Sequence, residues 1–386
     1  MAKPRRKTCA LLYGGDGGRS GVPRHLDQLC ETLGGKIDLT IASDRNCGGY
    51  DGIIRAGATH VEIEGLRNSL KPARLLRGWR SAQRLAAARK WDMIWLHARL
   101  PALMIRLSLA VGLLRLAPQT RLVMSYHGIP FDPGHRRLAA WASRWIEKLL
   151  LHRCPPMHLV FLSEDMVIRL RSAVGSRALQ RHEIHVLPNS SNLGNLPTRI
   201  ETPMETERHL VITGRAGYQK NYPLAARLMD HMPQGYILTL CGTGTDSPAF
   251  QTSILGLVRS ETRSRIRFAG SLADVRHVLA QADGYLLTSR YEGLPIGAIE
   301  AFESGLPLIL SSFEAAPEMV AAHPMALCLP LKDLPRDAAR ISRLIEEYKT
   351  DRPACSARIR AAWRRKYPYT VWQARVRRLM SEIMAN

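Results

Sequence analysis

The chain has 386 residues, of which 46% are hydrophobic and 23% are charged, and its formal net charge is +22. This length favours two domains, and the composition excludes a disordered or fibrous protein. The seven cysteines are scattered, odd in number and form no Cys-x-x-Cys pair, which argues against a disulfide framework or a zinc site and favours a reducing cytosol.

The positive charge is unevenly distributed, with +16 in residues 1–195 and +6 in residues 196–386. Such an excess favours an anionic partner, either nucleic acid or a membrane surface, and a merely soluble basic surface is the alternative. No apolar run follows the basic first residues, so we expect no signal peptide. Arg106 and Arg115 interrupt the most apolar segment, residues 100–117, which argues against a membrane span. We expect a cytoplasmic protein, peripheral on the inner face of the cell membrane.

The first predicted unit is a strand, a glycine-rich loop and a helix. Residues 8–13 are apolar, residues 14–21 are rich in glycine, and Pro23 begins a helix. This order is typical of the start of a Rossmann-like sheet. The glycines permit positive φ angles and close approach of the backbone to a ligand, which makes Gly15 a candidate binding residue. Their spacing is not that of a dinucleotide fingerprint and argues against NAD.

Two interpretations are open for residues 68–90, which follow predicted strands at residues 37–41 and 60–63. Basic side chains alternate there with leucines and Trp79 at helical spacing. The pattern suits a helix lying on a membrane interface, and it equally suits a solvated helix outside the sheet.

A histidine follows one of the next strands. Residues 91–97 and 121–125 read as strands, separated by an apolar helix from Pro101 to Leu116. The second strand delivers His127 at its carboxyl end, where ligands of open α/β sheets bind. A helix at 136–151, a strand at 158–162 and Ser163 as an N-cap come next. We expect the first domain to end at residue 190 and a linker to occupy residues 191–207.

The second half begins again with a strand at residues 209–213. Gly214, Arg215 and Lys220 follow it, before a helix from Pro223. An Arg and a Lys five residues apart across such a turn both reach one diphosphate; two surface cations are the alternative. Strands at 236–241 and 266–270 come next, and Gly242 lets the backbone approach a nucleotide. We expect helices at 273–282, 333–348, 354–363 and 370–384.

Residues 285–302 are the most informative stretch. An apolar strand ends in a polar turn, and Pro295 suits the first position of the helix that follows. The unpaired N–H groups of such a helix start favour a phosphate. Glu292 lies just before the helix, and Glu300 lies roughly 7–8 Å along its axis, about the reach from a sugar to a ribose across a diphosphate. A capping residue and a solvated glutamate are the alternative.

A family resemblance rests on these residues: Ser289-x-x-Glu292-Gly293-x-Pro295, Glu300-Ala301 and Gly305-x-Pro307. The spacing resembles the signature of retaining family-4 glycosyltransferases. The resemblance implies an α/β protein of the GT-B architecture, with two Rossmann-like doubly wound domains facing across a cleft. Residues 208–368 would form the nucleotide-sugar-binding domain, and residues 369–386 a terminal helix that packs back on the first domain.

The resemblance also implies roles for individual residues. The expected catalytic residues are His127, Arg215, Lys220 and Glu292. The expected donor-binding residues are Gly15, Gly214, Gly242, Ser289, Gly293, Leu294, Pro295, Ile296 and Glu300. The implied reaction moves a sugar from a nucleoside-diphosphate donor to a glycan or lipid-linked acceptor, with retention of configuration, in envelope polysaccharide or glycolipid biosynthesis. The chain contains no Asp-x-Asp motif, so we expect neither a metal ion nor another cofactor.

Three alternatives remain. A GT-B sugar epimerase or phosphorylase would share the fold, and a glycoside hydrolase also uses two carboxylates. A nucleic-acid-binding protein would explain the charge. Aromatic residues make up only 6% of the chain and no nucleic-acid-binding module is recognisable, so we expect no nucleic-acid partner.

Overall fold

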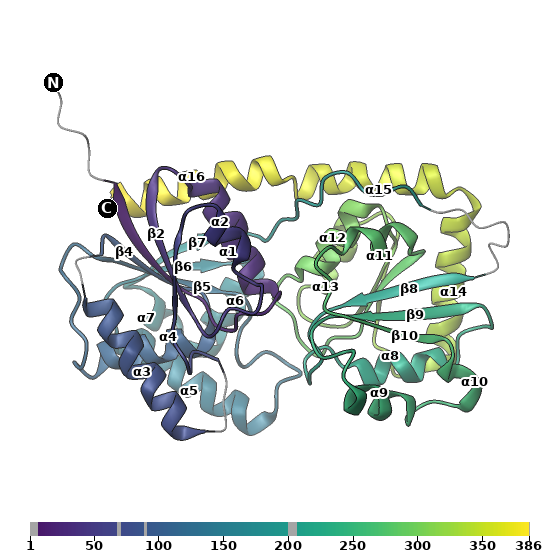
Figure 1. The fold of residues 1–386 in the computed structure, drawn as a ribbon, viewed down its shortest axis with the longest axis horizontal. Helices are drawn as coiled ribbons and strands as arrows, with labels where there is room; N and C mark the ends of the chain where they lie inside the picture. The colour runs from purple at the N-terminus through teal and green to yellow at the C-terminus, as the bar shows by residue number, and fades with distance from the viewer. Residues whose placement is uncertain (1–6, 68–70, 89–90, 200–206, 386) are drawn as a thin grey trace. The chain divides into compact units, whose positions relative to one another are not determined.

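The computed structural model describes residues 7–67, 71–88, 91–199 and 207–385, which form two compact units (Figure 1). The first unit contains the chain up to Phe131, Arg136–Pro188 and the chain from Thr370 onwards. The second contains Asp132–His135 and Asn189–Tyr369. The last helix of the chain is therefore part of the first unit, although the second unit precedes it in sequence.

The first unit is built on a seven-stranded sheet with the order β3-β2-β1-β4-β5-β6-β7, in which every pairing is parallel. Its inner strands are nearly continuous apolar runs, as expected for a parallel sheet covered on both faces. The strands are β1 (Thr8–Tyr13), β2 (Ile37–Ser43), β3 (Thr59–Glu62), β4 (Met93–Leu96), β5 (Arg121–Tyr126), β6 (His158–Phe161) and β7 (Glu183–Val186).

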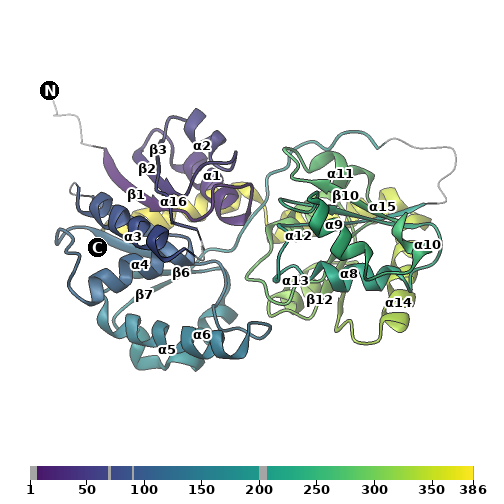
Figure 2. The ribbon, with the colours of Figure 1, turned by 60° about the horizontal axis from the view of Figure 1, so that its bottom comes forward.

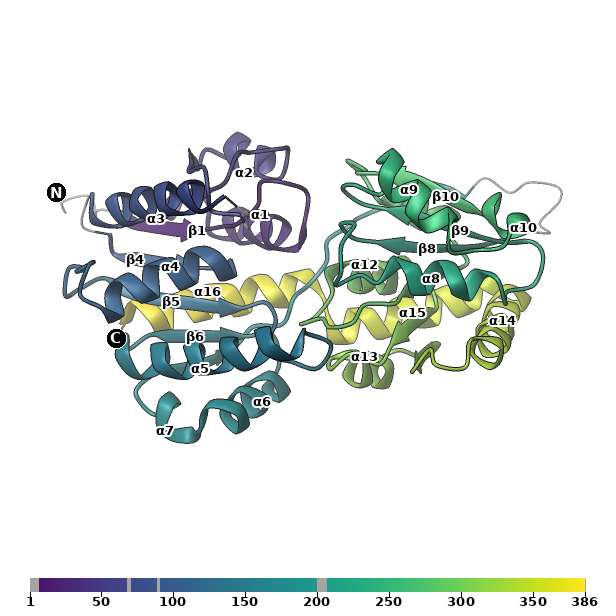
Figure 3. The same ribbon diagram turned by 90° about the horizontal axis from the view of Figure 1, so that it is seen from below.

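Helices cover both faces of this sheet, and α5 packs beside α6 (Figure 3). They are α1 (Gly21–Leu33), α2 (Asp51–Arg55), α3 (Pro72–Ala87), α4 (Arg99–Ala110), α5 (Arg137–Arg153), α6 (Glu164–Val174), α7 (Ser176–Leu179) and α16 (Tyr369–Ala385).

The second unit is built on a six-stranded parallel sheet with the order β10-β9-β8-β11-β12-β13. Its strands are β8 (Arg208–Thr213), β9 (Tyr236–Cys241), β10 (Ile266–Gly270), β11 (Gly284–Leu287), β12 (Leu308–Ser311) and β13 (Ala326–Leu329). Its helices, among which α8 lies beside α9 (Figure 2), are α8 (Tyr222–Met229), α9 (Pro248–Leu255), α10 (Ser260–Arg263), α11 (Arg276–Gln281), α12 (Ile296–Ser304), α13 (Ala316–Ala322), α14 (Leu334–Thr350) and α15 (Arg352–Lys366). Both units thus have the Rossmann-like sheet that the sequence predicts.

A buried ion pair explains the charged residue in the most apolar helix. Arg106 on α4 is 1% exposed, and its guanidinium lies 2.7 Å from Glu147 Oε1 on α5. The Tyr126 hydroxyl donates to the same oxygen at 2.5 Å. A buried arginine needs such a partner, so α4 is a core helix. No helix in the part of the chain that the structure describes is long and apolar enough to cross a membrane.

Most predicted elements are confirmed, and their ends differ by a few residues. The strands at 8–13, 236–241 and 266–270 have the expected bounds, and Ser163 caps α6 by accepting from the Met166 N–H at 3.2 Å. The helix predicted to reach Leu116 ends at Ala110, because Gly112 has a φ of 75°. The short helices α2, α7, α9, α10 and α13 were missed.

The helix expected within residues 68–90 is α3, and residues 68–70 and 89–90 lie outside the described part of the chain. Trp79 points inward and donates to the Ser108 hydroxyl of α4 at 2.7 Å. Arg74 pairs with the buried carboxylate of Asp44. Because its tryptophan is engaged in the protein, α3 fits the second interpretation, a solvated helix outside the sheet.

Candidate functional site

The predicted second-unit residues gather where the strand order of the sheet reverses. Strands β8 and β11 are neighbours, and the chain proceeds from β8 in one direction along the sheet and from β11 in the other. Ligands of open α/β sheets bind at the carboxyl ends of the strands at such a point. The two loops that leave these ends hold Gly214, Arg215 and Lys220 after β8 and Ser289 and Glu292 after β11.

Lys220 and Glu292 form an ion pair between these loops. The lysine Nζ lies 2.8 Å from Glu292 Oε1, and the side chains are 17% and 9% exposed. The Ser289 hydroxyl donates to the same carboxylate oxygen at 2.7 Å, and Gln219 Nε2 donates to the other oxygen at 3.1 Å. Of these four side chains, Lys220, Ser289 and Glu292 were expected at the site. Gln219 was missed, and its position beside Lys220 was the only signal for it.

Further hydrogen bonds hold the two loops together. The Thr288 hydroxyl donates to the Lys220 carbonyl at 3.0 Å, and the Arg290 N–H donates to the Gln219 carbonyl at 2.8 Å. The Ser311 hydroxyl, at the end of β12, donates to the Ser289 carbonyl at 2.6 Å. Hydrogen bonds to the backbone of the two loops, as well as the ion pair itself, therefore fix the positions of Lys220 and Glu292.

Two glycines bring the strand ends close together. Gly214 has a φ of 148°, and a Cβ there would lie 2.3 Å from the Lys220 Cε atom. Gly242, with a φ of 142°, would place a Cβ 1.9 Å from the Gly214 carbonyl oxygen. Both positions need glycine for their conformation and for the contact, so the loop after β9 lies directly against the loop after β8.

Helix α12 begins at Ile296, one residue later than expected, and Pro295 is its cap residue. Pro295 makes no side-chain capping bond, and the helix ends at Ser304, where the following Gly305 has a φ of 81°. The carbonyl of Leu294 accepts from Asn189 Nδ2 at 2.7 Å, which fixes the approach to the helix. Its first N–H groups remain suited to an anion.

Glu300 lies on α12 and is 7% exposed. Burial raises the pKa of the neighbouring Tyr285 hydroxyl, and the charges of Glu300 and Glu292 raise it further. That hydroxyl bonds to Thr213 Oγ1 at 2.8 Å, so β8 and β11 are joined beneath the site. A Cβ on Gly297 would lie 2.3 Å from the Thr213 oxygen, which explains the glycine in the first turn of α12. Arg215, by contrast, is exposed in the loop after β8.

A cavity of about 490 Å³ lies beside the loop after β8. Three of its eleven lining residues are aromatic: Tyr218, Tyr222 and Phe250. The guanidinium of Arg290 lies over the Tyr218 ring, 4.3 Å from its centroid. A partly aromatic pocket next to the Lys220–Glu292 pair is suited to a flat organic group.

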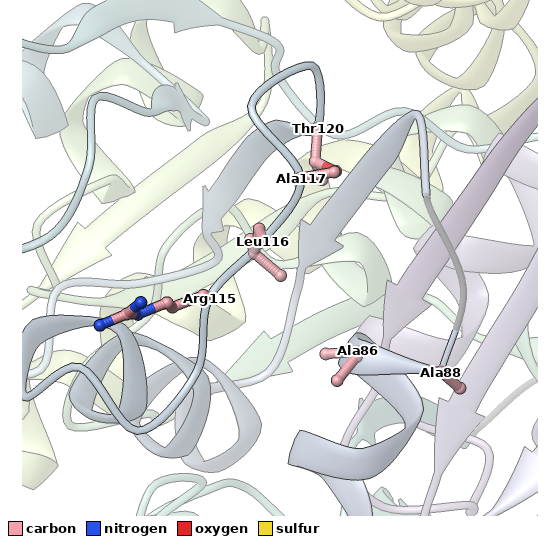
Figure 4. Close-up of a pocket in the computed structure, with 7 residues that line it drawn as sticks. Ala86, Ala88, Arg115, Leu116, Ala117 and Thr120 are labelled. Carbon is pink, nitrogen blue, oxygen red and sulfur yellow. The ribbon is translucent and has the colours of Figure 1, made fainter.

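A second cavity, of about 290 Å³, lies in the first unit between the end of α3 and the loop before β5 (Figure 4). Alanines 86 to 88 form one wall, and Arg115, Leu116, Ala117 and Thr120 form the other. None of the predicted site residues lines it, so we assign it no role.

In the first unit, Gly15 follows β1, but the positive φ angles that the glycine-rich loop was expected to use are not found there. Among the described residues, Gly14, Gly15, Gly17 and Gly18 are not in the positive-φ region. A Cβ on Gly17 would instead lie 1.9 Å from the Arg45 carbonyl oxygen, and the Gly15 carbonyl accepts from the Asp44 N–H at 2.9 Å. These glycines allow the loop after β1 to pack against the loop after β2.

His127 follows β5 as predicted and belongs to a group of three histidines. His97 Nδ1 lies 3.3 Å from His127 Nε2, and the ring centroid of His25 lies 4.8 Å from that of His127. Burial lowers the pKa of His127 and of His97 well below the usual range, and the charge of His25 is the next largest cause. Both imidazoles are therefore neutral at pH 7. His97 was missed, although it follows β4 as His127 follows β5.

Two family models match the chain. The model described as glycosyltransferase family 4 covers residues 19–193, and the model described as glycosyl transferases group 1 covers residues 207–347. The chain belongs to the family-4 glycosyltransferases of the GT-B type. The resemblance stated from the residues around Glu292 is thereby confirmed.

Solved structures share the fold of this chain. HepE from Anabaena in complex with UDP-glucose has a TM-score of 0.75 and 14% identity, with 97% of this chain and 99% of that chain covered. Sucrose-phosphate synthase from Thermosynechococcus elongatus has a TM-score of 0.76 and 17% identity, with 98% and 100% covered.

One curated relative is the UDP-Gal:alpha-D-GlcNAc-diphosphoundecaprenol alpha-1,3-galactosyltransferase of Escherichia coli. It is 23% identical over 250 residues, which cover 60% of each chain. The matched part of this family-4 chain thus spans about three fifths of the length of that relative.

Proposed function

We propose that this glycosyltransferase moves a hexose from a UDP-sugar to a glycan or lipid-linked acceptor, with retention of the anomeric configuration and without a metal ion. The observation that carries the proposal is the Lys220–Glu292 pair at the carboxyl ends of β8 and β11, directly before the start of α12. The names of the relatives support the uridine donor, since one uses UDP-Gal and another was solved with UDP-glucose.

The donor would bind by its charge and its hydroxyl groups. Arg215 and Lys220 would neutralise the diphosphate, one as a planar fork and the other as a point charge, together with the N–H groups of Gly293, Leu294 and Ile296. Glu300 would accept hydrogen bonds from the ribose hydroxyls. Glu292 would bind the sugar, and the neutral His127 would contact a sugar hydroxyl. Gly15, Gly242, Ser289, Leu294 and Pro295 would shape the surroundings.

The reaction breaks the bond between the sugar C1 and the diphosphate oxygen. The acceptor hydroxyl would form its bond to C1 from the same face, and its proton would pass to the departing phosphate oxygen. No separate general base is then required. The charge that grows on the leaving diphosphate is stabilised by fixed cations and N–H dipoles, which take the place of a metal ion.

A lipid-linked acceptor agrees with the surface of α5. Its outward face carries Leu138, Trp141, Trp145 and Leu149, which are 84%, 64%, 56% and 52% exposed. Arg137, Arg144 and Lys148 interleave with them, and Lys148 Nζ lies 5.7 Å from the Trp145 ring centroid. Exposed tryptophans among cations suit the interface of an anionic membrane. We therefore propose peripheral association with the cytoplasmic membrane surface through α5 and a place in envelope polysaccharide or glycolipid biosynthesis.

The test is a panel of UDP- and GDP-hexoses assayed for thermal stabilisation and then for nucleotide release. We expect one UDP-hexose to raise Tm. Free UDP should appear only when an acceptor is added, and EDTA should not prevent its release. NMR of the product would show the donor's anomeric configuration. UDP-sugar interconversion without an acceptor would indicate an epimerase, loss of turnover in EDTA would refute metal independence, and an inverted product would refute retention.

A further inference from the structure

A second group of chemically active side chains lies at the amino ends of β6 and β7, in the first unit. His158 is the first residue of β6, and Glu183 and His185 are the first and third residues of β7. His158 is the register partner of Glu183 in this parallel pair. Because residues two apart on a strand point to the same face, all three side chains share one face of the sheet. Nothing in the proposed transfer reaction uses them.

The spacing of their polar atoms matches a metal site. His158 Nδ1 lies 3.3 Å from Glu183 Oε2 and 3.2 Å from His185 Nε2. One ligand atom from each residue lies within 4.8 Å of both others. In a tetrahedral zinc site with bonds of about 2.0–2.2 Å, ligand atoms are roughly 3.3–3.6 Å apart. Two of the three spacings are therefore already close to those of a bound ion.

The surroundings of these side chains also suit a cation. Glu382 Oε2, on α16, lies 3.7 Å from His185 Nδ1, the nitrogen that faces away from the cluster. A carboxylate behind a ligating histidine fixes the ring and raises its basicity. Glu183 and Glu382 offset the nearby charges of Arg121 and Arg378.

We propose that His158, Glu183 and His185 bind a divalent transition-metal ion, Zn²⁺ or Ni²⁺, with one position left to solvent. Two imidazoles and one carboxylate are a ligand set for such ions. Glu183 is 52% exposed, so an ion can enter from solution. The ion would join β7, at the edge of the sheet, to β6 and, through His185 and Glu382, to α16. The site lies at the strand ends opposite to those that His127 follows.

The proposal is independent of the sugar-transfer proposal, because metal binding is measured without any donor. Untagged protein is titrated with NiCl₂ in a calorimeter, and its Tm is recorded with and without the ion. We expect one Ni²⁺ per chain at this site and a rise in Tm. His158→Gln and His185→Gln should each lower the affinity at least about tenfold, and Glu382→Gln by about tenfold.

Two further variants make the result decisive. Glu183→Gln changes a half-exposed residue, so it leaves the fold intact and should still weaken binding. His231→Gln changes an exposed histidine of the second unit and should leave binding unchanged. Equal Ni²⁺ affinity in the His158→Gln, His185→Gln double variant and the parent would overturn the proposal. If the parent protein shows neither Ni²⁺ binding nor a Tm shift, the proposal is also overturned, and the cluster is only a hydrogen-bond network that holds α16.

Discussion

Lys220 Nζ lies 2.8 Å from Glu292 Oε1, although 72 positions separate the two residues in the chain. The ammonium group has three donors, and this contact uses one of them. The others can serve a phosphate without breaking the pair. In the proposed mechanism the glutamate would therefore hold the lysine in position before the donor arrives, which would lower the reorganisation that the reaction requires.

Replacing Lys220 by Ala should lower kcat about 10²- to 10³-fold, the usual effect of removing one donor to a developing negative charge. The change in KM should be smaller, because Arg215 and the start of α12 still bind the diphosphate. Steady-state measurement of UDP release gives both constants. Lys332→Ala, at an exposed lysine of the same unit, is the matched control. A normal kcat in the Lys220 variant would remove this residue from the proposed mechanism.

Replacing Glu300 by Ala should weaken UDP binding about 10- to 100-fold, since hydrogen bonds to a charged group contribute roughly 1.5–3 kcal/mol. Isothermal titration calorimetry with UDP, without acceptor, measures the effect. Glu347→Ala, at an exposed position on α14, should leave the Kd unchanged. If the two variants bind UDP equally well, Glu300 does not hold the ribose.

His323 should make the fold sensitive to acid. Burial lowers its pKa from 6.5 to about 3, and its ring bonds to the Leu306 carbonyl at 3.1 Å and the Met325 N–H at 3.0 Å. Between pH 6.5 and about pH 3 the unfolded chain binds a proton at this histidine that the folded chain does not. The contribution of His323 to stability is therefore complete above pH 6.5 and falls as the pH decreases. Between pH 7.5 and 5.0 this group alone costs about 2 kcal/mol.

The His323→Gln variant tests this dependence, because the amide can replace both hydrogen bonds but does not titrate. Urea unfolding at pH 7.5 and 5.0 should show a smaller loss of stability in the variant than in the parent. Equal losses in both proteins would mean that His323 titrates normally.

Replacing Trp141 and Trp145 by Ser should reduce binding to anionic vesicles. Each lost aromatic group removes about 1–2 kcal/mol of apolar transfer free energy, so partition should fall roughly thirtyfold or more. Flotation with anionic liposomes at low and high salt measures it. Ile168→Ser, at an exposed position on α6, is the control. Absence of salt-sensitive binding by the parent itself would contradict membrane association.

The sequence was most informative where local chemistry decides the structure. The apolar runs predicted β1, β9 and β10, and the spacing from Ser289 to Glu300 predicted the strand, turn and helix that place Glu292. It could not predict that Gln219 would join Lys220 at that carboxylate, because such a contact depends on how two loops from distant parts of the chain meet.

Periodicity was least informative about which face of a helix is covered. Helices α3 and α5 both alternate cations with leucine and tryptophan, so the pattern alone treats them alike. In the structure Trp79 of α3 bonds to Ser108, whereas Trp145 of α5 remains more than half exposed. The neighbouring helix decides the difference, and its position does not follow from a single segment.

The buried pair of Arg106 and Glu147 limits how α5 can meet a lipid bilayer. Lifting α5 from the sheet would separate the two charges and leave Arg106 alone in the core, which costs about 3–5 kcal/mol for a buried pair. The gain from inserting two tryptophans is of similar size or smaller. The helix is therefore expected to rest on the lipid headgroups while it stays packed on the sheet of the first unit. Membrane binding would then orient the whole first unit instead of extracting α5 from it.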